Sequence, residues 1–352
     1  MPHYLSEFTP VELHKHLGVP LPETRKILAA WHRDGALPRA VQGVTRVSMN
    51  AARTLSVEPA LEVVAREESR IDPFVKYAFR THDAHAVEAV RIPLEKQGRF
   101  VVCVSSQVGC ALGCTFCATG RMGLTRNLET WEIIAQVRHV RAELPEGGRV
   151  NGVVFQGMGE PLANYERVLA ALRVMSDPCG MAIDARNITV TTSGLATQIR
   201  KLADDAPNVR LGWSVGSALP DTRRSLMPIT KAHSIEDVFE SVVAHTARTR
   251  IAPLFAYTPL AGINDTDADA RAFAALVTEF HERTGQRPRV SLIPYNSIGP
   301  DDPYQRQTEA AEESLRTLLR EYAVYTKKRY SGGGDVGAAC GQLAGAYVEP
   351  TA

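Results

Sequence analysis

The stretch Cys110-Ala111-Leu112-Gly113-Cys114-Thr115-Phe116-Cys117 places three cysteines in one short loop, with the spacing C-x3-C-x2-C. Three thiolates at this spacing can bind one metal cluster, and Gly109 and Gly113 let the backbone turn tightly around it. A structural zinc site or an ordinary four-cysteine cluster needs a fourth ligand. The missing ligand favours an iron–sulfur cluster with one iron left open to a substrate or cofactor. The alternatives are a zinc site completed by a distant histidine and a chance clustering of cysteines.

The segments around this loop alternate between strand and helix patterns. Val101–Val104 is a β-branched run just before the loop, and further short apolar runs follow it, each succeeded by a helical pattern. We expect these later strands at 152–155, 188–192, 211–215, 254–258, 290–294 and 324–329, and helices at 129–142, 198–204, 235–247, 268–283 and 309–322, with another beginning after Asn164. Six β-α units in series predict an α/β fold, with a parallel sheet curved into a partial (β/α)6 barrel. The cysteine loop then lies at the carboxyl end of the first barrel strand, where barrel enzymes carry out their chemistry.

The composition of the 352 residues indicates a globular protein in a reducing compartment. Hydrophobic residues make up 44% and charged residues 22%, and no stretch approaches the ~20 apolar residues of a membrane span. Met1-Pro2-His3-Tyr4 does not begin a signal peptide. Four of the six cysteines fall between Cys103 and Cys117, and a core of this size needs no disulfides. We therefore expect a cytoplasmic protein without a membrane anchor, and the net charge of +1 weighs against a large nucleic-acid interface.

The first part of the chain differs from the rest. Apolar residues at helical spacing, among them Leu13, Leu17 and Trp31, fit short amphipathic helices that Pro20 separates. We predict a small, mostly helical accessory domain over residues 1–85. Residues 86–352 then form the barrel and a C-terminal loop that carries Cys340.

Three further segments offer chemical groups. Gly157-Met158-Gly159-Glu160-Pro161 follows the second barrel strand, where glycines allow a small polar ligand to approach the backbone and Glu160 can bind an ammonium group. An ordinary strand-to-helix turn has the same composition. Cys340 is flanked by small residues, and Cys103 lies in the first barrel strand, so the two thiols could act as nucleophile and resolving partner. Cys179 lies in a turn between a helix and a strand, and we assign it no role.

The cysteine loop, with an aromatic residue before its last cysteine, resembles the radical S-adenosylmethionine (SAM) superfamily. That resemblance implies a 4Fe–4S cluster on Cys110, Cys114 and Cys117, whose open iron chelates the amino and carboxylate groups of SAM. It also implies a one-electron cleavage of SAM to a 5′-deoxyadenosyl radical. Segments 103–110, 157–161 and 339–343 together are similar to the RlmN/Cfr family, radical methylases of adenine in ribosomal and transfer RNA. This similarity extends from about residue 88 to residue 345.

The resemblance to the RlmN/Cfr family implies a two-stage reaction that consumes two SAM molecules. Cys340 accepts a methyl group from the first, and the radical from the second removes a hydrogen atom from that methyl group. The methylene radical adds to a ring carbon of adenine, and Cys103 then attacks the sulfur of Cys340, which releases the product and leaves a disulfide. Glu88 matches the family's acidic residue that removes the ring proton, for which hydrogen-bond reach in the complex is sufficient. A surface carboxylate is the alternative at this position.

The same resemblance assigns further residues to SAM binding. They are Gly159 and Glu160 after the second barrel strand, Thr191 on the third, Ser214 on the fourth and Asn296 at the last. Thr191 stands where a serine is usual, which keeps the hydroxyl. The chain departs from the family at 214–218, where Ser-Val-Gly-Ser-Ala replaces Ser-Leu-His-Ala and Gly216 removes an imidazole, and in the glycine-rich residues 332–337. The first 80 residues match no motif of the family.

These observations predict a radical SAM methyltransferase that adds a methyl group to carbon 2 of adenine in ribosomal or transfer RNA. Pro161 fits the carbon-2 branch of the family. Basic residues at predicted loop ends, among them Arg126, Arg223 and Arg224, could contact RNA, as could the N-terminal domain. The family implies an electron donor such as flavodoxin, and a monomeric enzyme. The alternatives are a related enzyme that methylates a different RNA or a small molecule by the same thiol chemistry, and a non-catalytic iron–sulfur protein that binds RNA.

Overall fold

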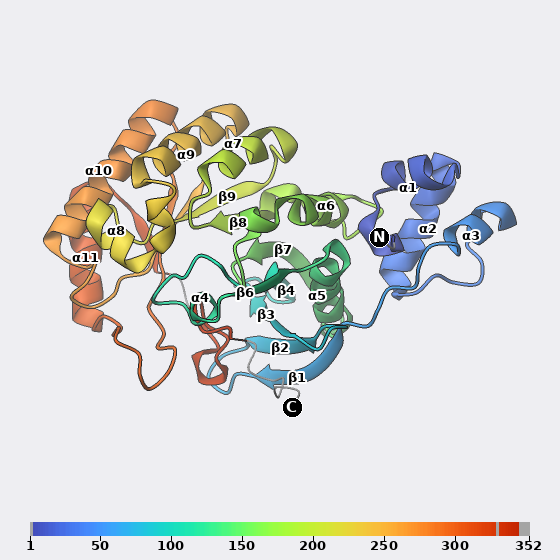
Figure 1. Ribbon diagram of the computed structural model, residues 1–352, viewed down its shortest axis with the longest axis horizontal. Helices are drawn as coiled ribbons and strands as arrows, with labels where there is room; N and C mark the ends of the chain where they lie inside the picture. Colours follow the sequence, from blue (N-terminus) through green and yellow to red (C-terminus); the bar gives the residue numbers. More distant parts are fainter. Residues whose placement is uncertain (1–2, 329–330, 345–352) are drawn as a thin grey trace.

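The computed structural model describes residues 3–328 and 331–344. They form one curved sheet of ten strands with helices along its outside, and three N-terminal helices stand apart at one end of the molecule (Figure 1).

The parallel part of the sheet confirms the predicted β-α units. Its strands are β4 (Arg99–Cys103), β7 (Arg149–Phe155), β8 (Ile188–Thr192), β9 (Arg210–Ser214), β10 (Leu254–Tyr257), β11 (Arg289–Leu292) and β12 (Thr326–Lys328). Its main helices are α5 (Thr130–Ala142), α6 (Tyr165–Ser176), α7 (Ala196–Asp205), α9 (Ile235–Thr249), α10 (Asp267–Thr284) and α11 (Glu309–Glu321). These strands pair in parallel in that order. Their carboxyl ends therefore meet at one edge of the sheet. Arg329, where we predicted the last strand to end, lies outside the described residues.

Three antiparallel strands extend the sheet beyond β4: β1 (Glu62–Glu68), β2 (Val75–Arg80) and β3 (Ala86–Pro93). The prediction of mostly helical structure up to residue 85 was therefore wrong for this segment. The reason is that the charges of β1, a strand at the edge of the sheet, form cross-strand ion pairs with β2. Glu62 lies 2.6 Å from the guanidinium of Arg80, and Glu67 lies 2.9 Å from Nζ of Lys76.

The helical part of the N-terminal segment ends at Ala52. It consists of α1 (Pro10–Leu17), α2 (Leu21–Asp34) and α3 (Arg46–Ala52), which share a small apolar core around Leu13, Ile27 and Met49. The group docks on α5. The guanidinium of Arg138 lies 4.9 Å from the ring centroid of Trp31, and the rings of Tyr4 and Trp131 meet edge to face at 5.8 Å.

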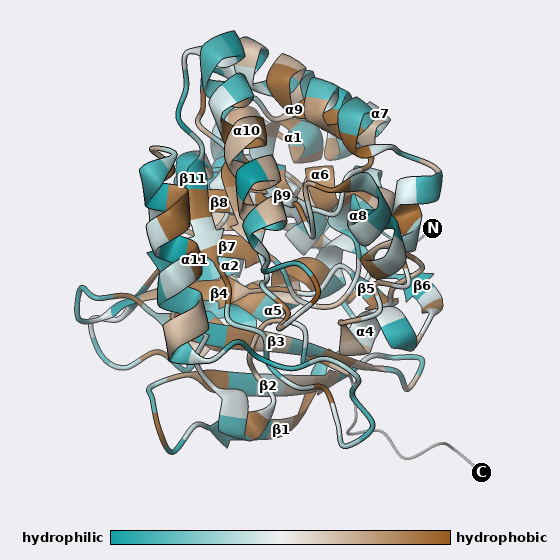
Figure 2. Ribbon diagram, turned by 90° about the vertical axis from the view of Figure 1, so that its left-hand side faces the viewer, coloured by the Kyte–Doolittle hydropathy of each residue, from teal (hydrophilic) through white to brown (hydrophobic). Residues whose placement is uncertain are grey.

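The main core lies between the sheet and the helices that cover it. The strands are largely hydrophobic, and the outer surfaces of α10 and α11 are largely hydrophilic (Figure 2). Trp213 of β9, Phe255 of β10 and Phe280 of α10 are fully buried and contact one another edge to face, with ring centroids 5.1–5.2 Å apart. This packing fixes the relative positions of the strand ends. None of the described helices is both long and apolar enough to cross a membrane.

Four short elements that we did not predict surround the cysteine loop: β5 (Gln107–Gly109), α4 (Ala118–Arg121), β6 (Leu124–Asn127) and α8 (Pro220–Leu226). β5 and β6 form an antiparallel hairpin that carries the cysteine loop and α4 between its strands. Gly109 has φ +74°, and a Cβ at this position would lie only 1.9 Å from the carbonyl oxygen of Gly123. Only glycine therefore permits this close approach at the start of the loop.

A buried histidine gives the fold a testable pH dependence. His245 of α9 is 1% exposed, neither ring nitrogen has a hydrogen-bond partner among the described residues, and burial lowers its pKa from 6.5 to about 4. Protonation therefore favours the unfolded state, and stability should fall as the pH drops from 6.5 towards 4. Between pH 6.5 and 4 the wild-type protein should lose free energy of unfolding through this histidine. We predict that His245→Leu abolishes on the order of 3 kcal/mol of that loss. Urea unfolding at several pH values measures it, with the exposed His16→Leu as control. An unchanged pH dependence in His245→Leu would contradict the prediction.

Candidate active site

One cleft opens where the carboxyl ends of the parallel strands meet. Its empty space, with the open solvent at its mouth included, is about 900 Å³. Every strand from β7 to β11 contributes residues from its end or from the loop that follows. The cysteine loop closes one side of the cleft through Cys114, Phe116 and Cys117, and Cys340 and Gly341 from the C-terminal loop also line it. The fold thus brings residues from most of the predicted site to one place.

The three cysteines of the loop act on one another electrostatically. Cys114 and Cys117 line the cleft, and Cys110 is buried beside them. Burial raises the pKa of Cys110 and of Cys114 to about 12, and the negative charge of Cys117 adds to both shifts. Two buried thiols and the half-buried Cys117, which repel one another as thiolates, fit a cationic iron–sulfur core, which would reverse this effect.

Glu160 is a buried carboxylate at the edge of the cleft. It is 3% exposed, and its two oxygens accept hydrogen bonds from the backbone N–H groups of Leu162 (3.0 Å) and Ser193 (2.9 Å). Burial raises its pKa to about 7. Among the described residues, no Lys, Arg or His lies within ion-pair distance of this carboxylate. This environment fits the ammonium group that we predicted as its ligand.

Gly159 and Gln107 hold Glu160 in position. Gly159 has φ +95°, and a Cβ there would lie 2.5 Å from the Cβ of Gln107. The side-chain oxygen of Gln107 accepts a hydrogen bond from the backbone N–H of Glu160 at 2.8 Å. Sequence reasoning missed Gln107, because a glutamine in a short strand carries no motif of its own.

The remaining predicted cofactor residues differ in their positions. Thr191 and Ser214 line the cleft, and the buried hydroxyl of Thr191 has no hydrogen-bond partner in the described part of the chain. Such an unsatisfied polar atom fits a polar ligand. Asn296 does not line the cleft, and its amide donates instead to the hydroxyl of Ser331 (2.8 Å) and the carbonyl of Pro294 (3.1 Å).

Gly216 stands where the resemblance described above implies a histidine, and Met227 fills the space beside it. Gly216 has φ +71°, and a Cβ would lie 2.3 Å from the sulfur of Met227. Met227 is fully buried and lines the cleft. A histidine at residue 216 therefore does not fit this backbone unless Met227 moves.

The loop that carries Cys340 is anchored at both ends. Before Cys340, the carboxylate of Asp335 accepts hydrogen bonds from the hydroxyl of Ser69 and the backbone N–H of Arg70, in the turn between β1 and β2. After Cys340, the carbonyl of Gly341 accepts a hydrogen bond from the backbone N–H of Ala118 at 2.8 Å. The second contact joins the C-terminal loop directly to the residue that follows Cys117.

Cys103 and Cys340 line a second, smaller cavity, which we call the thiol cavity; its empty space, with the solvent at its mouth included, is about 420 Å³. Cys340 and Gln156 line both this cavity and the cleft. No disulfide is present among the described residues, which include all six cysteines. Cys179 lies in neither cavity.

Glu88 is buried rather than exposed, which excludes the surface alternative. It lies on β3 at 2% exposure, and its carboxylate accepts a hydrogen bond from the backbone N–H of Ala344 at 2.8 Å. Nζ of the buried Lys76 lies 3.7 Å from the same carboxylate. Glu88 thus contacts the C-terminal loop, but it lines neither the cleft nor the thiol cavity.

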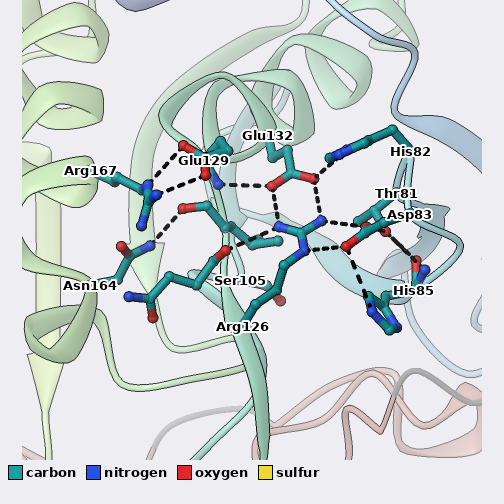
Figure 3. A network of polar contacts seen from close by, with 12 residues as sticks. Thr81, His82, Asp83, His85, Ser105, Arg126, Glu129, Glu132, Asn164 and Arg167 are labelled. Atoms are coloured by element: carbon teal, nitrogen blue, oxygen red, sulfur yellow. Dashed lines mark hydrogen bonds and ion pairs between the residues drawn. The ribbon is translucent and has the colours of Figure 1, made fainter. Parts of the chain in front are cut away.

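A network of polar contacts fixes the hairpin that carries the cysteine loop (Figure 3). Arg126 of β6 donates to Asp83, in the turn between β2 and β3 (2.6 Å), and to the fully buried Glu132 of α5 (2.7 and 2.8 Å). His82, Asp83 and Glu132 could together hold a cation, but the single positive charge of Arg126 already pairs with both carboxylates. Arg126, predicted as a basic residue at a loop end, is thus largely engaged within the protein.

Comparison with known proteins identifies related sequences and a related structure. Residues 104–277 match the radical SAM superfamily. The chain is 52% identical to a probable RNA methyltransferase of Sorangium cellulosum, over 95% of this chain and 90% of that protein. It is 39% identical to the dual-specificity RNA methyltransferase RlmN of Syntrophobacter fumaroxidans, over 82% of this chain and 81% of that protein. The crystal structure of a radical SAM methyltransferase from Sphaerobacter thermophilus is 35% identical, with a TM-score of 0.87 over 98% of this chain and 100% of that one.

The network around Arg126 yields a prediction about stability. Arg126→Met leaves the buried carboxylate of Glu132 without its cation, and we expect this to cost about 3 kcal/mol. Adding Glu132→Gln removes the unpaired charge, so the double variant should be more stable than Arg126→Met alone. Urea unfolding at pH 7 measures both variants. The prediction fails if Arg126→Met unfolds at the wild-type urea concentration.

Proposed function

Because the chain belongs to the RlmN/Cfr family of radical SAM methyltransferases, we propose that it methylates carbon 2 of adenine in ribosomal or transfer RNA. One observation carries the proposal: Cys340 lines both the cofactor cleft and the cavity that contains Cys103. A thiol in this position can meet a cofactor on one side and a second thiol on the other. A non-catalytic iron–sulfur protein would need neither thiol.

The residues around the cleft fit a cluster and SAM. Cys110, Cys114 and Cys117 would hold the 4Fe–4S cluster. Four further residues, Gly159, Glu160, Thr191 and Ser214, would hold SAM, with Glu160 on the amino group. Its buried carboxylate without a cation, and the unsatisfied hydroxyl of Thr191, support this assignment. When bound, the cluster and SAM supply the methyl group and a 5′-deoxyadenosyl radical. The predicted role of Asn296 finds no support, because its amide is already engaged outside the cleft.

Cys340 and Cys103 would act in sequence. The thiolate of Cys340 would displace the methyl group from one SAM, so that the S–C bond forms as the methyl–sulfonium bond breaks and S-adenosylhomocysteine leaves with the electron pair. With the radical that a second SAM would supply, this methyl group would lose one hydrogen atom and its carbon would bond to adenine, and the adduct would then lose the ring proton and return one electron to the cluster. The thiolate of Cys103 would next attack the sulfur of Cys340. An S–S bond forms, the S–C bond breaks, and its electron pair stays on the methyl-derived carbon, which takes up a proton to complete the methyl group. Cys103 and Cys340 are free cysteines in the structure, so the disulfide itself stays a prediction. An electron donor such as flavodoxin would reduce the cluster, and we expect a monomer.

Glu88 would remove the ring proton from the adenine adduct. Its contacts with Lys76 and with the backbone of Ala344 support the role, because they hold the carboxylate against the loop that carries Cys340. Glu88 lines neither cavity, so the adenine or the loop that carries Cys340 must move before Glu88 can reach the ring proton. Catalytic hydrogen bonds are often long in a protein without its ligands and shorten only in the reacting complex.

The names of the relatives support RNA as the substrate, and ribosomal and transfer RNA imply a cytoplasmic reaction. The target adenine must leave its stack to enter the cleft. The N-terminal helices α1–α3 would contact the RNA as an accessory unit, for which their separate core provides the structural basis. A small-molecule substrate is the competing reading and an outcome of the test below.

Mass spectrometry of nucleosides tests the proposal. The protein is expressed in cells that lack endogenous adenine-carbon methylases, and ribosomal and transfer RNA are digested and analysed. We predict 2-methyladenosine with the wild-type protein and with the control Cys179→Ala, and none with Cys340→Ala.

Three results would contradict parts of the proposal. 2-Methyladenosine from Cys340→Ala would exclude the thiol mechanism, and 8-methyladenosine would exclude the assigned carbon. No methyladenosine from a protein with an assembled cluster would exclude the RNA substrate.

A further inference from the structure

Arg223 is a fully buried cation whose hydrogen-bond partners are all neutral. It lies on α8 with no exposed surface. Its guanidinium donates to the carbonyl of Val215 (2.9 Å), to the hydroxyl of Thr230 (2.6 Å) and to the carbonyl of Ser193. No carboxylate lies within 4.0 Å of it in the described part of the chain. The sequence had indicated an RNA-facing residue, but Arg223 faces the interior.

An unpaired charge in this position is strongly unfavourable, because burial removes the water that would solvate it. Buried ions in proteins are generally paired or hydrogen-bonded to a group of opposite charge. Glu236, at the start of α9, is exposed, so water screens its charge. The remaining place for a compensating charge lies in the direction of the cysteine loop, which adjoins α8.

The contacts of α8 support this direction. The carbonyl of Leu226, at the end of α8, accepts a hydrogen bond from the backbone N–H of Thr115 at 3.0 Å, and Leu226 packs with Cys114 in one apolar cluster. Ser193 connects the same guanidinium to the cleft, because its carbonyl accepts from Arg223 and Ser193 lines the cleft together with Cys114. The cation is thus fixed by neutral groups behind one predicted cluster ligand.

We propose that Arg223 is a positioning residue whose buried positive charge compensates the negative charge of the cluster on Cys110, Cys114 and Cys117. The inference rests on the cluster in the proposed function. Three thiolates on a doubly positive 4Fe–4S core leave one net negative charge, and one electron from the reductant adds a second. No bond forms or breaks in this step. A fixed nearby cation stabilises the more negative, reduced form and so raises the reduction potential.

Redox titration of the reconstituted protein, followed by electron paramagnetic resonance, tests the inference. Arg223→Gln removes the charge but keeps a hydrogen-bond donor. We predict that its reduction equilibrium becomes at least tenfold less favourable, a shift of 59 mV for one electron to a more negative potential. Arg223→Lys should stay closer to wild type than Arg223→Gln, because it keeps the charge. The adjacent Arg224→Gln is the matched control, since Arg224 is exposed and pairs with Asp221.

A second pair of variants leaves Arg223 in place and covers the case in which Arg223→Gln fails to fold or to hold iron. Thr230→Asp places a carboxylate against the guanidinium, and Thr230→Asn places a neutral group of the same size there. We predict that the cluster in Thr230→Asp has a more negative reduction potential than the cluster in Thr230→Asn. The reduction equilibrium should again be at least tenfold less favourable.

The outcomes distinguish this inference from the proposed function. Equal potentials in Thr230→Asp and Thr230→Asn, or a wild-type potential in Arg223→Gln, would overturn the role of Arg223 and leave the cluster intact. A wild-type protein that assembles no 4Fe–4S cluster would overturn the proposed function, and with it this inference.

Discussion

The hydrogen bond from the backbone N–H of Ala118 to the carbonyl of Gly341 joins the two loops on which the site depends. Ala118 follows the last cysteine of the cluster motif, and Gly341 follows Cys340. A backbone contact between residues so distant in sequence needs a framework that holds both loops still. Two parts of the fold provide it: the separate β5–β6 hairpin and its polar network anchor the first loop, and the β1–β2 turn of the ten-stranded sheet anchors the second. Cys340 consequently lies at the boundary of two cavities.

The charges of the cleft are incomplete in the protein alone. Among the described residues, Glu160 in the cleft has no cation within ion-pair distance, and the buried Arg223 beside the cleft has no carboxylate within that distance. Both are hydrogen-bonded to Ser193, the carboxylate through its backbone N–H and the guanidinium through its carbonyl. Fixed charges of this kind cost stability in the apo protein and favour ligands that bring the opposite charge. An amino-acid-like cofactor beside an anionic cluster is such a ligand set.

Much of the fold could be predicted from the sequence, because most of the parallel strands, though not β12, are short apolar runs followed by a helical period. The three predicted cysteine ligands lie within eight residues of sequence, so they could be assigned to one site without knowledge of the tertiary structure. β1 was missed because its run of charged residues forms cross-strand pairs that a single segment does not reveal. The burial of Arg223 was missed for a similar reason: it depends on carbonyls of β8 and β9 loops that only the folded chain brings together. Asn296 was assigned by resemblance alone, and its amide faces Ser331 rather than the cleft.

The central claim is that Cys340 carries the transferred carbon and Cys103 releases it, and one variant tests this directly. Cys103→Ala can still link Cys340 to RNA through the transferred carbon. It cannot break the S–C bond of that link by disulfide formation. Incubation of this variant with RNA and SAM under reducing, anaerobic conditions should give a covalent protein–RNA species, detectable by denaturing electrophoresis and assigned to Cys340 by mass spectrometry of the digested adduct. The species should be absent from the double variant that also carries Cys340→Ala. Free methylated RNA at the wild-type rate, with no adduct, would contradict the account.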